Sequence, residues 1–337
     1  MKAVAYTHSL PISDPRALQD MDLPDPRLES PHDLLVRVRA ISVNPVDAKV
    51  RLNRSPEPDH PVVLGWDAVG TVLEAGSQAS GFKPGDRVFY AGDRNRAGSN
   101  SERQIVDARL VGHAPTSLSD AEAAALPLTS ITAWELLFER LGVARDGGEG
   151  QSLLIVGAAG GVGSMLIQLA RRLTRLKVIA TASRPESARW VTELGAHAVI
   201  DHHQRLAPQL AALGITEVSM VASLTHTIEH FDDCVEALAP QGKLALIDDF
   251  PALDVMKMKA KSLSLHWESM FTRSHFQTTD MARQGEILDE IARLADSARL
   301  RTTLTRSQGS ISAENLRHAH ELIESGRSIG KLVLEGF

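Results

Sequence analysis

The first third of the chain alternates short apolar runs with turn-forming residues. Residues 1–8, 33–44, 68–76 and 85–92 are rich in Val and other strand formers and are bounded by Pro, Gly or Asp. Each of these segments is predicted to be a β-strand. A succession of many short strands predicts a compact all-β unit in this part of the chain.

The pattern becomes helical after residue 118. Residues 119–143 predict a helix, with Ser119 or Asp120 as its N-cap and Gly142 as its stop. The apolar run 151–158 is then followed by a glycine cluster and an amphipathic stretch. This order repeats in a looser form, with strands predicted over 177–183, 197–203, 219–224 and 243–249 and a helix over 185–195.

Alternating strands and helices of this length predict parallel βαβ units with helices on both faces of one sheet. The predicted fold class is therefore α/β, with a doubly wound Rossmann domain beside a second, β-rich domain. A chain of 337 residues is long enough for two domains. A last helix is predicted over 312–326 and a last strand over 330–337.

The glycine cluster lies where a predicted strand ends and a predicted helix begins. Backbone amides and the positive helix end can receive a pyrophosphate there, and side chains would block its approach. Because the cluster opens a βαβ run, we expect it to bind a dinucleotide. The alternative is a turn used only for tight helix-to-sheet packing. The expected binding residues of the turn are Gly157, Ala159, Gly160, Gly161, Val162 and Gly163.

The end of the next strand favours NADPH over NADH. An NAD site usually places a carboxylate about 20 residues past the glycines, on the ribose 2′-hydroxyl. Here Ser183 and Arg184 stand at that strand end instead. An arginine can meet a 2′-phosphate with charge-assisted hydrogen bonds. The alternatives are a solvated surface arginine for Arg184 and simple helix capping for Ser183.

Composition narrows the partners and the compartment. The net charge of -6, without any basic block, makes nucleic acid an unexpected partner. Cys234 is the only cysteine, so neither an intramolecular disulfide nor a multi-cysteine zinc site is available. The N-terminus has no apolar core of a signal peptide, and no stretch approaches the about 18 apolar residues of a membrane span. We therefore expect a cytoplasmic protein with no membrane partner.

Several motifs resemble one known family along the whole chain. They are ISVNPVDAKVR, HPVVLGWDAVGTVLEAG, FKPGDRVFYAG, LPLTSITAWELLFERL, IVGAAGGVGSMLIQLA, TASRPES and IGKLVLEGF. In these segments the chain resembles the quinone oxidoreductase (zeta-crystallin-like) branch of the medium-chain dehydrogenase/reductase superfamily. Within that branch it is most similar to the zinc-type alcohol dehydrogenase-like group.

The resemblance implies a domain plan. It implies a GroES-like β-barrel catalytic domain over residues 1–124 and a Rossmann NADP-binding domain over 125–272. The segment 273–337 is implied to return to the catalytic domain, and the cofactor to bind in the cleft between the domains. It also implies that Lys331, in the terminal motif, contacts the cofactor.

The sequence departs from the alcohol dehydrogenases at their zinc ligands. Asn44 stands where those enzymes carry a cysteine ligand, and Gly65, Trp66 and Asp67 stand where they carry Gly-His-Glu. Catalytic zinc needs about three protein ligands from Cys, His or carboxylate. The structural zinc of that family takes four cysteines, which this chain lacks. We therefore expect no metal.

Without zinc, acceptors that delocalise the incoming charge are favoured. We expect NADPH to reduce a quinone or an enone, with alkenals or another carbonyl class as an alternative substrate. The resemblance places Asn44, Asp47, Thr129 and Thr132 beside the nicotinamide. Asn44 and the threonines can hydrogen-bond an oxyanion, although Asn44 and Asp47 are also residues that form turns.

Two further expectations concern assembly and function class. The segment 262–271 could be the last strand of the sheet, and its free edge would suit pairing with a second copy in a homodimer, as in related family dimers. A protein that binds NADPH without catalysis, as a sensor or structural protein, is the alternative from another class. The polar candidates at positions 44, 47, 129 and 132 favour the enzyme.

Overall fold

The computed structural model describes all 337 residues and divides the chain into two compact units. Unit 1 comprises Met1–Ile131 and Phe271–Phe337, and unit 2 comprises Thr132–Met270. The sequence prediction put the corresponding limits after residues 124 and 272. In the structure the first limit lies after Ile131, inside the helix Pro127–Trp134.

Unit 1 is built on a seven-stranded sheet in the order β15-β16-β3-β5-β6-β8, with β7 paired to β3. A second sheet has the order β2-β1-β4. The N-terminal and C-terminal chain segments of unit 1 meet where β16 pairs antiparallel with β3. The strands are β1 (Lys2–Tyr6), β2 (Gln19–Asp22), β3 (Asp33–Val43), β4 (Val62–Val63), β5 (Ala68–Ala75), β6 (Arg87–Tyr90), β7 (Arg103–Asp107), β8 (Val111–His113), β15 (Leu304–Ser307) and β16 (Lys331–Glu335).

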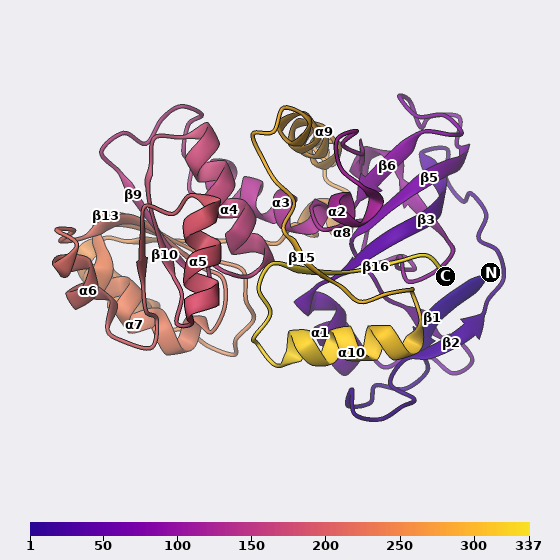
Figure 1. The fold of residues 1–337 in the computed structure, drawn as a ribbon, viewed down its shortest axis with the longest axis horizontal. Helices are drawn as coiled ribbons and strands as arrows, with labels where there is room; N and C mark the ends of the chain where they lie inside the picture. The colour runs from indigo at the N-terminus through magenta and orange to yellow at the C-terminus, as the bar shows by residue number, and fades with distance from the viewer. The chain divides into compact units, whose positions relative to one another are not determined.

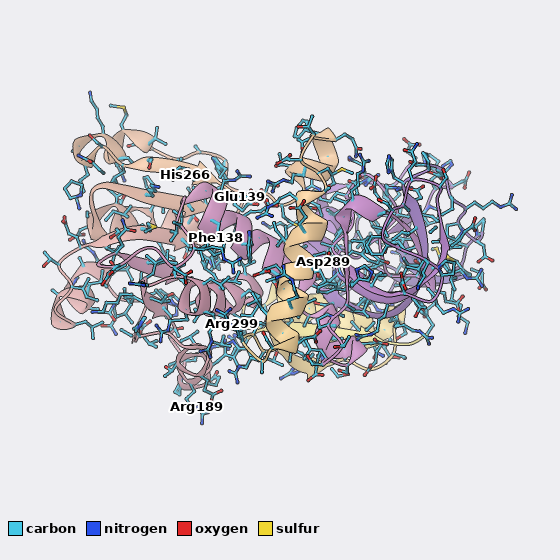
Figure 2. All side chains as sticks on the ribbon, turned by 90° about the horizontal axis from the view of Figure 1, so that it is seen from above. Phe138, Glu139, Arg189, His266, Asp289 and Arg299 are labelled. Carbon is cyan, nitrogen blue, oxygen red and sulfur yellow. The ribbon has the colours of Figure 1, made fainter.

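Helices from both ends of the chain cover this sheet, and α1 packs against α10 (Figure 1). Asp289 of α9, labelled in Figure 2, accepts a hydrogen bond from the backbone N–H of His113 at 2.9 Å and so ties α9 to β8. The helices are α1 (Pro45–Asn53), η1 (Ala108–Leu110), α2 (Asp120–Ala124), α3 (Pro127–Trp134), α8 (Thr272–Phe276), α9 (Arg283–Asp296) and α10 (Ala313–Glu324).

The helix predicted over residues 119–143 is not continuous, and that prediction is wrong on this point. Ser119 does cap a helix, because its hydroxyl accepts from the N–H of Glu122 at 3.2 Å. That helix, α2, ends at Ala124, and α3 begins at Pro127. Proline lacks the N–H that a continuing helix requires, but its fixed φ suits a first turn. A π-helical segment, η2 (Glu135–Arg140), follows α3 directly.

Unit 2 has the predicted Rossmann architecture. Its six strands are parallel and lie in the order β11-β10-β9-β12-β13-β14, so the strand order reverses between β9 and β12. One face packs against α6, α7 and η3 through an apolar core that includes Leu206, Phe231 and Met258. Helices α4 and α5 pack against each other and against β10 and β11 (Figure 1).

The elements of unit 2 agree with most of the predicted segments. They are β9 (Ser152–Val156), α4 (Gly161–Leu173), β10 (Lys177–Thr181), α5 (Pro185–Leu194), β11 (Ala198–Ile200), α6 (Leu206–Ala212), β12 (Val218–Ser223), α7 (Thr227–Ala237), β13 (Leu238–Leu246), η3 (Val255–Lys261) and β14 (Ser264–Trp267). Strand β14 is an edge of the sheet, and Trp267 on it is 50% exposed. No helix of either unit has the length and apolar character needed to span a bilayer.

One buried histidine makes the stability of unit 1 depend on pH. His320 of α10 is fully buried, and neither ring nitrogen has a hydrogen-bond partner. Burial, together with the nearby cation of Arg51, lowers the pKa of His320 to about 3. The fold therefore holds the neutral ring, whereas the unfolded chain takes up a proton below about pH 6.5. Stability is lost as the pH falls from about 6.5 towards 3.

We predict that His320→Leu reduces this acid sensitivity. Between pH 7.5 and 5.0 the wild type should lose about 2 kcal/mol of unfolding free energy through this group, and the variant should not. Urea unfolding at the two pH values measures the difference. His318→Leu, at an exposed position on the same helix, is the matched control. Equal losses in the wild type and in His320→Leu would contradict the assignment.

Candidate functional site

A buried polar cluster joins three parts of unit 1. The ammonium of Lys331 donates to the Asn44 side-chain oxygen at 2.5 Å, to the Asp67 carboxylate at 3.0 Å and to the Val43 carbonyl at 3.0 Å. The Asn44 amide also donates to Asp67 at 2.7 Å. All three side chains are at most 3% exposed. Each buried charge in the cluster therefore has an opposite charge and several hydrogen bonds.

Asp67 also fixes the start of α3. Its second oxygen accepts from the backbone N–H of Leu128 at 2.7 Å, at the end of the helix where negative charge is favoured. Burial raises the pKa of the Asp67 carboxyl, while the Lys331 cation and these hydrogen bonds lower it. The Lys331 ammonium lies 3.0 Å from the Asp67 carboxylate, but burial is the larger effect and the pKa of Asp67 is raised overall.

Asp47 lies in the first turn of the helix α1, and its side chain caps that turn. Its carboxylate accepts from the backbone N–H of Asn44 at 2.5 Å, and Pro45 begins the helix. Burial raises the pKa of Asp47 to about 7. Asp47 is therefore a structural cap whose proton equilibrium falls near neutrality.

The two expected threonines lie on α3. The Thr129 hydroxyl donates to the Leu126 carbonyl at 3.2 Å, and its side chain is 2% exposed. Thr132 is also buried. Arg51, another cation near Asn44 in the sequence, is fully buried and is bonded to the Leu10 carbonyl and to Glu324. The structure thus brings Asn44 and Lys331 into one cluster and directs Arg51 elsewhere.

The residues around Asn44 do not fit a zinc ion. Zinc in proteins prefers Cys sulfur, His nitrogen and carboxylate oxygen, about three of them in a catalytic site. Here the donors are an amide, a carboxylate and a carbonyl, and an ammonium already lies among them. Trp66 is buried against Phe271, with ring centroids 6.1 Å apart. No group of three His, Cys, Asp or Glu residues in the chain could hold a metal ion.

Three glycines in the glycine turn of unit 2 differ in what their surroundings require of the residue at that position. Gly157 has φ +77°, a conformation that other residues rarely adopt. A Cβ at Gly163 would lie 2.5 Å from the Ala158 carbonyl oxygen, so the helix could not pack so closely. A Cβ at Gly160 would meet only the Gly157 carbonyl oxygen, at 3.6 Å. The fold itself does not require a glycine at position 160.

These roles are those of a dinucleotide-binding turn: a tight turn, backbone approach to the pyrophosphate, and close helix packing. Gly160 is the N-cap of α4, and Gly161, Val162 and Gly163 form its first turn, so their N–H groups lie at the positive helix end. Ala159 lies in the same turn. The residues present therefore fit a pyridine dinucleotide at the strand-order reversal of the sheet.

Ser183 and Arg184 follow β10 on the same edge of the sheet. Arg184 is the N-cap residue of α5, and its side chain is 37% exposed and lies 3.5 Å from the Glu186 carboxylate. No acidic residue occupies either position. The guanidinium is partly exposed at this edge, and an arginine can pair with a phosphate as well as with a carboxylate.

Unit 2 contains a pair of buried glutamates that the sequence analysis did not predict. Glu135 begins η2 and Glu268 follows β14, and both are at most 2% exposed. Arg140 donates to Glu268 at 2.8 Å. Burial and the neighbouring Glu135 raise the pKa of Glu268 to about 9, so the pair holds a proton at neutral pH. No local motif marks two residues so far apart in the chain.

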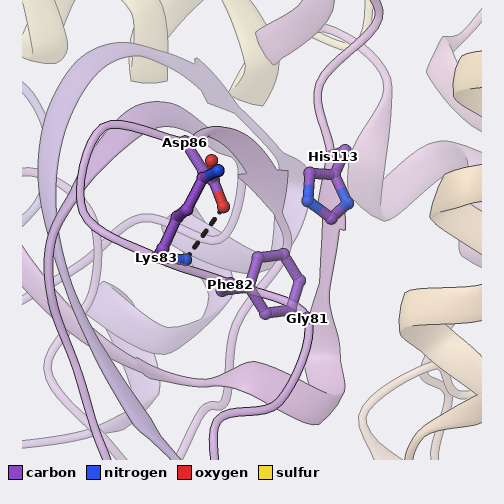
Figure 3. A pocket seen from close by; sticks show the side chains of 5 residues that line it. All are labelled: Gly81, Phe82, Lys83, Asp86 and His113. Carbon is purple, nitrogen blue, oxygen red and sulfur yellow. Dashed lines mark hydrogen bonds between the residues drawn. The ribbon is translucent and has the colours of Figure 1, made fainter.

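A surface hollow of unit 1 lies away from this chemistry. It measures about 350 Å³ and is lined by Gly81, Phe82, Lys83, Asp86 and His113 (Figure 3). Phe82 stacks on His113 with ring centroids 4.8 Å apart. None of the candidate site residues lines this hollow.

Comparisons with known proteins agree with this architecture. Residues 30–125 match the alcohol dehydrogenase GroES-like domain, and residues 194–334 match a zinc-binding dehydrogenase model. A zinc-type alcohol dehydrogenase-like protein of Staphylococcus epidermidis is 38% identical and covers 99% of both chains.

Two solved structures are also similar. A Rhizobium etli protein assigned to the zinc-dependent alcohol dehydrogenases is 51% identical, with a TM-score of 0.96 and coverage of 100% of this chain and 98% of that one. A mycobacterial protein complexed with NADPH is 29% identical, with a TM-score of 0.82 and coverage of 99% of both chains.

The glycine turn yields a matched pair of variants. Gly163→Ser should lower the unfolding free energy by about 1–3 kcal/mol, because its side chain meets the Ala158 backbone. Gly160→Ser should leave stability unchanged, because serine is a good N-cap and the space is open. It should instead weaken NADPH binding by about tenfold or more, since its side chain obstructs the diphosphate. Urea unfolding and fluorescence titration separate the two effects, and similar behaviour of both variants would refute these roles.

Proposed function

We propose that this chain, which belongs to the zinc-type alcohol dehydrogenase-like proteins of the medium-chain dehydrogenase/reductase superfamily, reduces quinones or other conjugated carbonyls with NADPH and without catalytic zinc. Membership of this family makes it an oxidoreductase. The observation that carries the choice of acceptor is the ammonium of Lys331 lying between Asn44 and Asp67.

The lack of zinc ligands around Asn44 supports the proposed class of acceptor. Zinc supports alcohol oxidation as a Lewis acid on the developing alkoxide, which is worth several kcal/mol. Lys331 cannot take over that task, because it is buried and its three N–H bonds are directed at protein oxygens. Quinones and enones need less help, since hydride addition gives a hydroquinone anion or an enolate whose charge is delocalised.

The cofactor preference rests on the end of β10. When bound, NADPH supplies the hydride. The glycine turn would hold its diphosphate, and Arg184 would pair with its 2′-phosphate. Asn44, Thr129 and Thr132 would orient the nicotinamide carboxamide or the acceptor oxygen, so that this chain contributes mainly positioning and hydrogen bonds.

The direct test is consumption of NADPH with candidate acceptors. Metal-free protein should oxidise NADPH with 1,2-naphthoquinone, phenanthrenequinone or an enone, and a chelator should leave the rate unchanged. Primary alcohols with NADP⁺ should give no measurable rate. Chelator-sensitive alcohol oxidation without quinone or enone reduction would refute the proposal, and NADPH binding without turnover of any acceptor would favour a non-catalytic role.

Cofactor discrimination is tested by Arg184→Ala. Removing a charged hydrogen-bond donor to the 2′-phosphate should raise the Kd for NADPH by about tenfold or more and leave the Kd for NADH nearly unchanged. Calorimetry with both nucleotides measures the two constants. Arg189→Ala, at an exposed position on the same helix (Figure 2), should change neither constant. A loss of affinity shared equally by NADH and NADPH would assign Arg184 a structural role.

A further inference from the structure

The Lys331 ammonium lies inside a cage of protein oxygens. A carbonyl, an amide oxygen and a carboxylate surround Nζ at 2.5–3.0 Å, and the side chain is 3% exposed. These oxygens come from Val43, Asn44 and Asp67. One fixed cation with three oxygen partners is the arrangement of a filled cation site.

Strand register makes this placement unavoidable. Leu332 of β16 pairs with Val43 of β3, so the preceding Lys331 lies beside Asn44, which directly follows β3. Ala68 of β5 pairs with Ile41 of the same strand, which brings the preceding Asp67 to the same place. The cage is therefore a product of the sheet itself.

We propose that Lys331 is the resident cation of this site and that its ammonium excludes zinc from the position between Asn44 and Asp67. In the resemblance described above, Asn44 stands at the cysteine ligand of the alcohol dehydrogenases, and Asp67 stands at the last residue of their Gly-His-Glu motif, next to the lost histidine position at Trp66. A zinc ion at the same oxygens would lie beside a positive charge of the protein. Displacing the ammonium would leave it buried and unpaired, which is strongly unfavourable.

Zinc binding would then require the removal of Lys331 as well as the return of the missing ligands. This conclusion rests on the geometry of unit 1 and not on the proposed reduction of quinones. It also gives Lys331 a role inside unit 1 that does not depend on the cofactor contact implied by the terminal motif.

The test compares two variants that supply zinc ligands. The first carries Asn44→Cys and Trp66→His, and the second adds Lys331→Met, which removes the charge and keeps an apolar chain. Both are incubated with one equivalent of zinc, desalted and analysed for bound metal. Cobalt(II) replaces zinc in a parallel sample, because thiolate coordination to cobalt gives a characteristic absorption.

The triple variant should retain close to one zinc per chain and show the cobalt–thiolate band. The double variant should bind zinc at least about 100-fold more weakly, because the ammonium repels the ion. Equal zinc affinity in the two variants would overturn the proposal. Failure of both to bind would overturn it too, since removing the ammonium must free the position. Neither result depends on enzymatic activity.

A second measurement covers the case in which the ligand variants do not fold. Lys331→Ala removes three methylene groups and the ammonium, which is the outline of propylammonium. Added propylammonium should raise the urea midpoint of Lys331→Ala towards that of the wild type, because it binds only the folded cage. Lys83→Ala, at a surface lysine of unit 1, should not respond. No rescue of Lys331→Ala would refute the cage as a cation site.

Discussion

The ion pair between Lys331 and Asp67 is the constraint on which unit 1 depends. It joins the last strand of the chain to the strand that begins at Ala68. Asp67 also accepts a hydrogen bond from the N–H of Leu128 in the first turn of α3. A buried ion pair contributes little net stability by itself, but losing one partner strands the other charge in the interior. The pair therefore fixes one arrangement of the central sheet, because any other pairing of β16 with β3 would leave both charges unmatched.

The same pair limits the chemistry that unit 1 supports. A Lewis acid must keep an open coordination position for the substrate. The Lys331 ammonium has none, since its hydrogen bonds end on Val43, Asn44 and Asp67. The cluster therefore provides a fixed positive charge without an open coordination position. Substrates that carry their own means of spreading negative charge suit such a site better than simple alcohols.

Much of unit 2 could be predicted because its signals are local. A strand, a glycine turn and a helix follow one another within about 20 residues, and each glycine reports a constraint at its own position. The positions of Ser183 and Arg184 just after the second strand could be predicted for the same reason. Around Pro127 the local pattern is misleading, because composition favours one helix over 119–143. Proline divides it instead, and the π-helical turn that begins at Glu135 left no recognisable pattern.

The cluster in unit 1 could not be predicted because it is made by contacts that are remote in sequence. Lys331 and Asn44 are separated by 287 positions, and only the antiparallel pairing of β16 with β3 brings them together. The sequence showed that the family's cysteine and histidine zinc ligands were missing. It did not show whether the position of the metal ion is left empty or is occupied by another group of the protein. We propose the second case. Lys331, from the far end of the chain, lies against Asn44 and Asp67, so the missing ligands and this cation would belong to one electrostatic arrangement.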